Sequence, residues 1–149
     1  MSGFQPANPD FEARVRESFS RQPFMGFIGA DLAIVEPGYC EIHLPYRPEL
    51  TQQHGFVHGG ALATLADNAA GYAAFSLMPA DASVLTVEYK LNIMRPGRGD
   101  KMTARGKVIK PGRTITVVES NVYGVEDGKE VMCVTSIQTI MALHGREDR

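Results

Sequence analysis

The stretch from Ala61 to Leu77 constrains the fold more than any other part of the chain. Its apolar residues recur with the period of a helix and fall on one stripe, made by Leu62, Leu65, Ala66, Ala69, Ala70, Ala73 and Leu77. Most of these side chains are small, so the helix can approach a neighbouring backbone closely. We therefore predict a helix buried against a sheet. It should end at Met78-Pro79, because proline cannot continue a helix.

The segments on both sides of this helix predict strands that pair with their neighbours. Upstream, Glu36-Pro37-Gly38 separates two strand-like runs, 32–35 and 39–44. Downstream, turn residues separate four more runs, and Asp127-Gly128 is the strongest hairpin signal among them. These four runs are 83–93, 101–110, 113–125 and 129–143. One long helix with antiparallel strands around it predicts the α+β fold class.

The length of 149 residues is that of one domain, which we place at residues 1–149. An N-terminal helix over about residues 8–21 is predicted from the spacing of Phe11, Val15 and Phe19, with Asn8 as a candidate cap. The C-terminal tail, about residues 144–149, is expected to fray.

Charge and composition exclude several classes of protein. The chain has 15 basic and 17 acidic residues, without the basic surplus that nucleic-acid binding uses. No run approaches the roughly 20 apolar residues of a membrane span, and the N-terminus lacks a signal-peptide pattern. Two cysteines, Cys40 and Cys133, are too few for a disulfide scaffold and are expected to be reduced and buried. We predict a soluble, cytoplasmic protein that binds neither nucleic acid nor membrane.

Candidate chemistry lies in residues 52–60, immediately before the long helix. The first N–H groups of a helix have no intrahelical partner, and the helix dipole is positive there. Gly59 and Gly60 at this start would let a substrate approach, so the site could hold an anion or a carbonyl oxygen that becomes negative. The same glycines would also suit a tight turn into the helix, and the local sequence leaves both interpretations open.

Asp67 is the only acidic residue of the predicted helix. It lies on the flank of the apolar stripe, among the small residues Ala63, Gly71 and Ala74, where a carboxylate could act as general base or nucleophile. The alternative is a solvated or hydrogen-bonded aspartate on a helix surface. The glycine pair two turns away favours the functional interpretation, because we expect both groups to reach one substrate.

Histidines and basic residues give weaker signals. His54 and His58 have metal-ligand spacing, but His43 and His144 lie elsewhere and zinc sites hold three or four ligands. We predict no metal and no cofactor, and a structural role for His58 in bonding the loop backbone. Four basic residues in or beside predicted turns could meet phosphates or be ordinary solvated charges: Arg95, Arg98, Lys110 and Arg113.

The run Gln52-x-x-Gly55-x-x-His58-Gly59-Gly60, with Leu65-x-Asp67 on the following helix, resembles the motif of the hotdog-fold acyl-CoA thioesterases. It is most similar to the PaaI-type subfamily, over about residues 24–142, and the similarity includes Thr86 and the turn Met94-Arg95-Pro96-Gly97. The resemblance implies a curled antiparallel sheet that wraps the long helix. It also implies a homodimer or homotetramer, in which two chains join their sheets and acyl-CoA binds between subunits.

The same resemblance implies a role for each matching residue. The backbone N–H of Gly59 polarises the thioester carbonyl, and Asp67 of the facing subunit activates water or attacks directly. Thr86 holds water or the carboxylate, and Gln52 stands where most of the subfamily has asparagine. The catalytic set is completed by His58. The expected substrate-binding set is Gly55, Gly60, Arg95, Arg98, Lys110 and Arg113.

The function that these residues predict is hydrolysis of acyl-CoA to a carboxylic acid and CoA. A thioester needs no serine triad, and the Gly-x-Ser-x-Gly elbow is missing. Two alternatives are a non-catalytic acyl-CoA binding or sensor module and a hotdog dehydratase or hydratase. The first predicts binding without turnover, and the second pairs histidine and acid at spacings that we do not find.

Four residues could line an acyl pocket or belong to the core: Phe56, Tyr72, Phe75 and Met78.

Overall fold

A computed structural model describes residues 3–148. The elements in chain order are α1 (Phe11–Ser20), α2 (Pro23–Ile28), β1 (Asp31–Glu36), β2 (Tyr39–Pro45), the 3-10 turn η1 (Pro48–Leu50), α3 (Gly59–Phe75), β3 (Ala82–Ile93), β4 (Lys101–Lys110), β5 (Ile115–Glu126) and β6 (Lys129–His144). The strand bounds agree with the predicted runs to within two residues.

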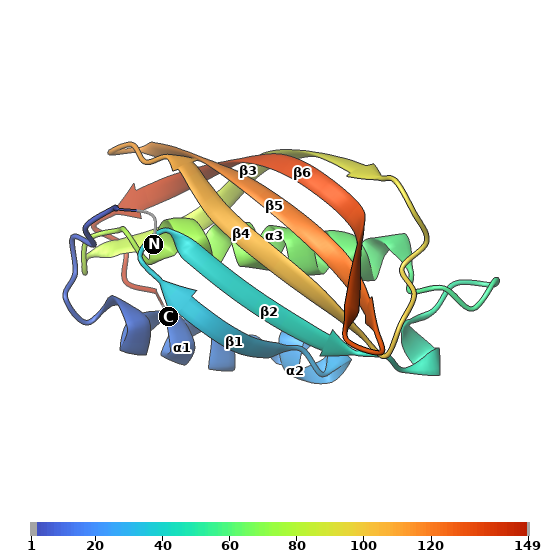
Figure 1. The fold of residues 1–149 in the computed structure, drawn as a ribbon. Helices are drawn as coiled ribbons and strands as arrows, with labels where there is room; N and C mark the ends of the chain where they lie inside the picture. Colours follow the sequence, from blue (N-terminus) through green and yellow to red (C-terminus); the bar gives the residue numbers. More distant parts are fainter. Residues whose placement is uncertain (1–2, 149) are drawn as a thin grey trace.

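Six antiparallel strands form one sheet in the order β1-β2-β4-β5-β6-β3. The sheet curls around α3, while α1 and α2 lie near the edge that β1 forms (Figure 1). The predicted α+β architecture, a curled antiparallel sheet wrapping one long helix, is confirmed. Because β3 stands at the end of the strand order, its second edge pairs with no strand among residues 3–148.

The small residues of α3 allow the close approach that the sequence predicts. A Cβ atom added to Gly106 of β4 would lie 2.2 Å from the carbonyl oxygen of Ala69, so only glycine fits beneath the helix there. The helix buries Leu65, Ala66 and Ala69 completely. This packing fixes the position of every other α3 side chain, including Asp67 on the flank of the helix.

The N-terminal region differs from its prediction in two ways. Helix α1 begins at Phe11, three residues late, because the Asn8 side chain accepts a hydrogen bond from the Asp10 N–H at 3.1 Å and forms a turn before the helix. A second helix, α2, follows directly. No second helix is predicted there, but Pro23 occupies the first position of α2, where proline favours a new helix.

The C-terminal tail contacts α1 in the structure. Its Asp148 carboxylate pairs with the Arg21 guanidinium at 2.7 Å, so at this residue the tail does not stand free as expected. Residue 149, the last of the tail expected to fray, lies outside the described residues.

Cys40 and Cys133 are both free thiols and both buried. No helix of the described part of the chain is long and apolar enough to cross a membrane.

Candidate active site

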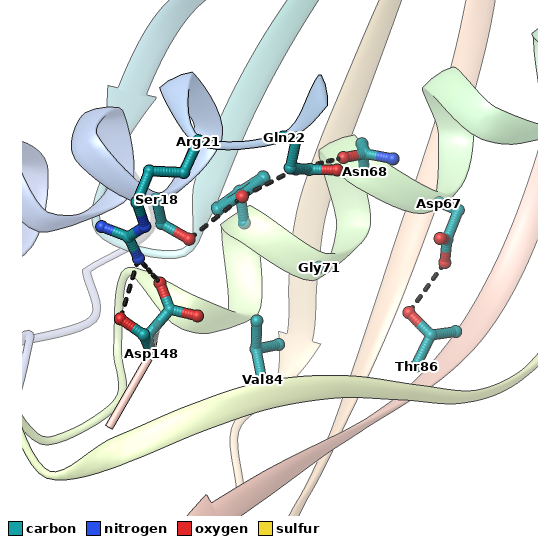
Figure 2. Close-up of a pocket in the computed structure, with 10 residues that line it drawn as sticks. Ser18, Arg21, Gln22, Asp67, Asn68, Gly71, Val84, Thr86 and Asp148 are labelled. Carbon is teal, nitrogen blue, oxygen red and sulfur yellow. Dashed lines mark hydrogen bonds and ion pairs between the residues drawn. The ribbon is translucent and has the colours of Figure 1, made fainter. Parts of the chain in front are cut away.

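The carboxylate of Asp67 is held by a hydroxyl from the edge strand. Helix α3 positions Asp67, and β3 positions Thr86, whose Oγ1 donates a hydrogen bond to Asp67 Oδ1 at 2.8 Å (Figure 2). The pairing of β3 with β6 skips Val87, so a β-bulge follows Thr86 immediately. Bulges re-aim side chains at the edge of a sheet. The bulge therefore lies next to the residue whose hydroxyl must point toward Asp67.

Burial sets the protonation of Asp67. The side chain is half-buried, and loss of solvent raises its pKa above the ordinary aspartate value, while the hydrogen bond from Thr86 acts in the opposite direction. The raised pKa makes this carboxylate a stronger base than a solvated one. A general base acts in its ionised form, and the hydrogen bond from Thr86 favours that form.

Replacement of Thr86 by valine tests this balance. The variant keeps the side-chain shape but removes the bond that favours the ionised carboxylate, so the pKa of Asp67 rises further. A general base works only when ionised, so activity that depends on Asp67 as the base would be lost as pH falls through this pKa. We expect the acid limb of the kcat/KM profile to move to higher pH. Thr139→Val, which removes a hydroxyl bonded to the exposed Glu88, should leave the limb in place. If the acid limb of Thr86→Val also stays at the wild-type pH, this role of Thr86 is contradicted.

The start of α3 leaves one backbone donor free. The His58 ring caps the helix, because its Nδ1 accepts a hydrogen bond from the Gly60 N–H at 2.8 Å. The next two N–H groups, of Ala61 and Leu62, donate to the His58 carbonyl. Within the described residues the Gly59 N–H has no acceptor. The structural role predicted for His58 is thus present, and it withdraws the Gly60 N–H from ligand binding.

A groove of about 320 Å³ surrounds Gly59. It is lined by Gln52, Phe56, Val57, Gly59, Leu62, Ile93, Met94, Arg95, Pro96 and Gly97. The side-chain oxygen of Gln52 accepts a hydrogen bond from the His54 N–H, which shapes the loop. Gly55 has φ +80°, a backbone conformation that favours glycine, and it is not among the residues that line this groove.

Asp67 and Gly59 do not face one groove in a single chain. Eight residues of helix separate them, which corresponds to about 12 Å along the axis. Asp67 lines a different groove, together with Thr86, Asn68 and Gly71. The expectation that both groups reach one substrate is therefore wrong for an isolated chain, since a carbonyl oxygen must lie within about 3 Å of its donor.

The basic residues also separate into two pairs. Arg95 and Arg98 follow β3 and precede β4, whereas Lys110 is the last residue of β4 and Arg113 follows that strand, so the two pairs lie at opposite ends of β4. A ten-residue strand spans about 30 Å. One chain therefore does not assemble the four expected substrate contacts. The Arg98 guanidinium lies over the Phe56 ring, 4.4 Å from its centre.

A third cavity, of about 400 Å³, adjoins the Gly59 groove and shares Arg95 and Pro96 with it. Its other lining residues are Arg98, Gly124, Glu126, Asp127, Lys129 and Val131. Sequence reasoning missed Lys129, although this residue directly follows the Asp127-Gly128 turn and could have been found as a basic residue beside a hairpin.

The groove beside Asp67 contains residues that no sequence motif indicated. Ser18, Gln22 and Asp148 line it from helix α1, the segment after that helix and the C-terminal tail. Of the four ambiguous residues, Tyr72 lines this groove and Phe56 lines the Gly59 groove. Phe75 and Met78 are buried in the core.

The remaining histidines do not converge. The His43 ring bonds Glu41 at 2.7 Å, and His144 bonds the Arg113 carbonyl at 2.7 Å. Among the residues that the structure describes, no group of three or more His, Cys, Asp or Glu side chains could hold a metal ion.

A curled antiparallel sheet around one helix, with a carboxylate on that helix and a free donor at its start, defines the class of hotdog-fold thioester hydrolases. Comparison with known proteins agrees. The model of the thioesterase superfamily matches residues 54–131, and the chain belongs to this family. A thioesterase family protein from Silicibacter pomeroyi is 47% identical, with a TM-score of 0.89 over 91% of this chain and 99% of that chain.

Two curated relatives are similar over most of their length. A protein from Halobacterium salinarum, provisionally named an esterase, is 32% identical over 85% of each chain. The acyl-coenzyme A thioesterase PaaI of Escherichia coli is 31% identical over 66% of each chain.

Proposed function

We propose that this protein hydrolyses acyl-CoA thioesters to a free acid and CoA, at two equivalent sites that each need two copies of the chain. The observation that carries the proposal is the free Gly59 N–H at the start of the same helix that bears the half-buried Asp67 carboxylate. One group suits the carbonyl oxygen of a thioester, and the other suits the attacking water.

The chemistry follows from the two groups. The Gly59 N–H donates to the carbonyl oxygen and stabilises the negative charge that develops there. Asp67 accepts a proton from a water molecule while the oxygen of that water bonds to the carbonyl carbon. The C–S bond then breaks, and the thiolate leaves and takes up a proton. Attack by the Asp67 oxygen itself, followed by hydrolysis of the anhydride, would use the same geometry.

Two copies of the chain can bring a Gly59 N–H and an Asp67 carboxylate together, although these groups lie far apart within one chain. A two-fold axis perpendicular to α3 would run the helices of two chains in opposite directions, so that Gly59 of one chain can approach Asp67 of the other. The free edge of β3 offers the contact, because an unpaired strand edge is a template for another strand. Five apolar residues on or just after β3 are between 48% and 52% exposed: Leu85, Val87, Tyr89, Ile93 and Met94.

The cavity lined by Arg95, Arg98 and Lys129 supports CoA as the thiol part of the substrate. Guanidinium and ammonium groups bind phosphates, and this cavity opens beside the groove that holds Gly59. Two similar proteins are named for CoA thioesters, PaaI of Escherichia coli and the 1,4-dihydroxy-2-naphthoyl-CoA hydrolase of Listeria monocytogenes.

Release of free thiol tests the proposal. We expect hexanoyl-CoA to be hydrolysed with a much lower KM than the same acyl group on N-acetylcysteamine, which lacks the phosphates. Arg98→Ala should raise the KM for hexanoyl-CoA about tenfold, in keeping with one lost charged hydrogen bond, and leave the short thioester unchanged. Equal KM values for the two thioesters would contradict the phosphate site.

Two alternative functions make different predictions. A sensor would bind acyl-CoA without releasing thiol, so measurable binding without turnover by the intact protein would overturn hydrolysis. A dehydratase needs a histidine that is free to exchange protons. The Nδ1 of His58 already accepts the Gly60 N–H, and this contact disfavours His58 as such a base.

A further inference from the structure

The groove that leads away from Asp67 is small and polar. It has a volume of about 300 Å³, which is the lower limit for ligand pockets. Helix α3 forms one side, the α1 region and β3 face each other across it, and Asp67 and Asp148 stand at opposite ends (Figure 2). Among the described residues that line it, Val84 alone has an aliphatic side chain.

A hydrogen-bonded network of uncharged groups forms the inner wall. The Gln22 Nε2 donates to Asn68 Oδ1 at 2.8 Å and to the Tyr72 hydroxyl at 2.7 Å. The Tyr72 hydroxyl is 3.1 Å from Ser18 Oγ, and both of these residues are buried. Because Tyr72 accepts from Gln22, it can donate to Ser18.

This network has hydrogen-bonding capacity left. With Tyr72 as donor to Ser18, the Ser18 O–H is free to donate to a further group. The Gln22 Oε1 has no partner among residues 3–148, although its amide nitrogen makes two bonds. A hydroxyl placed in the groove could therefore donate to Gln22 and accept from Ser18.

An ion pair stands at the end of the groove opposite Asp67 (Figure 2). Tyr72 lies five residues after Asp67 on α3, about 7.5 Å along the axis. Beyond it, Asp148 bonds Arg21 at 2.7 Å and accepts from the Ser83 hydroxyl at 3.4 Å. A long acyl chain would have to displace this ion pair, whereas a compact group fits in front of it.

We propose that this groove takes the acyl group of the substrate and selects compact acyl groups that carry a hydroxyl at the end distant from the thioester, with Ser18 and Gln22 as the specificity-determining residues. This inference rests on the proposed acyl-CoA hydrolysis, because Asp67 places the reacting carbonyl at the mouth of the groove. An acyl group without the hydroxyl would cover polar groups and leave them unpaired, which disfavours its transition state.

A matched pair of substrates tests the selection. Thiol release from 6-hydroxyhexanoyl-CoA and hexanoyl-CoA is measured for the wild-type chain, Gln22→Leu, Ser18→Ala and the exposed control Gln5→Leu. We expect the wild-type chain and the control to favour the hydroxylated substrate about tenfold in kcat/KM, as for one or two net hydrogen bonds. Gln22→Leu should abolish this preference, and Ser18→Ala should lower it about threefold.

The outcomes separate the two proposals. Release from neither substrate would overturn acyl-CoA hydrolysis, and the selection with it. If the wild-type chain releases thiol from both substrates but does not favour the hydroxylated one, the proposed selection is overturned and acyl-CoA hydrolysis is not. An undiminished preference in both variants would show that Ser18 and Gln22 do not set it. If Gln22→Leu does not fold, Ser18→Ala decides, since it removes only one hydroxyl.

Discussion

Replacement of Asp67 by asparagine is expected to lower kcat about 10³-fold while the chain still folds and binds acyl-CoA. Asparagine has the same shape as aspartate, and it can still accept the Thr86 hydrogen bond through its carbonyl oxygen. It cannot take a proton from water or attack a thioester. Binding is expected to survive because the groups proposed for the CoA phosphates lie in another cavity.

Thiol release under saturating hexanoyl-CoA measures this loss, and the control is Asp31→Asn on the exposed end of β1. The control should have wild-type kcat. Thermal unfolding of Asp67→Asn should give a Tm no lower than that of the wild-type chain, because the substitution removes a partly desolvated charge. Wild-type kcat in Asp67→Asn would exclude this carboxylate from the reaction.

Replacement of Gly59 by proline is the second large effect, because it deletes the proposed oxyanion donor itself. Proline has no N–H, and in this structure the Gly59 N–H makes no bond that the fold needs. Proline is favoured at the first position of a helix. The preceding residue, His58, has φ −57° and ψ 137°, the conformation that a following proline requires.

We expect Gly59→Pro to lower kcat by about 10²–10³-fold, the usual effect of losing one oxyanion donor. Gly59→Ala is the matched control, since it keeps the N–H. Its added Cβ would meet only the end of the Ile93 side chain, at 3.0 Å, and that flexible side chain can move. Alanine should therefore keep most of the activity. Equal activity of the two variants would show that the Gly59 N–H stabilises no charge.

Local sequence patterns predict most of the sheet and helix α3, because period and turn residues report directly on these elements. Local patterns are ambiguous where a residue type suits both a turn and the start of a helix. The sequence predicts no helix directly after about residue 21, yet Pro23 begins α2. Gly59 and Gly60 suit either a tight turn or the start of the helix, and α3 does start at Gly59, where the His58 side chain caps it.

The candidate site is predictable only in part, for a physical reason. The motif identifies Gly59 and Asp67, and the resemblance adds Thr86, which the structure finds bonded to Asp67. Ser18 and Gln22 carry no local signal, because their contacts with Tyr72 span 54 and 50 residues. Similarly, the length of β4, and not turn composition, decides that Arg98 and Arg113 lie far apart.

The most direct test of a site shared between two chains mixes the two inactive variants. Asp67→Asn and Gly59→Pro chains are unfolded together, refolded at equal amounts and assayed for thiol release from hexanoyl-CoA. In a mixed dimer, one site combines an intact Gly59 with an intact Asp67, and the other site has neither. Random pairing should therefore restore about a quarter of wild-type activity, given two-fold symmetric dimers. If the mixture stays as inactive as its components, the two groups do not meet across an interface, and the shared site is wrong.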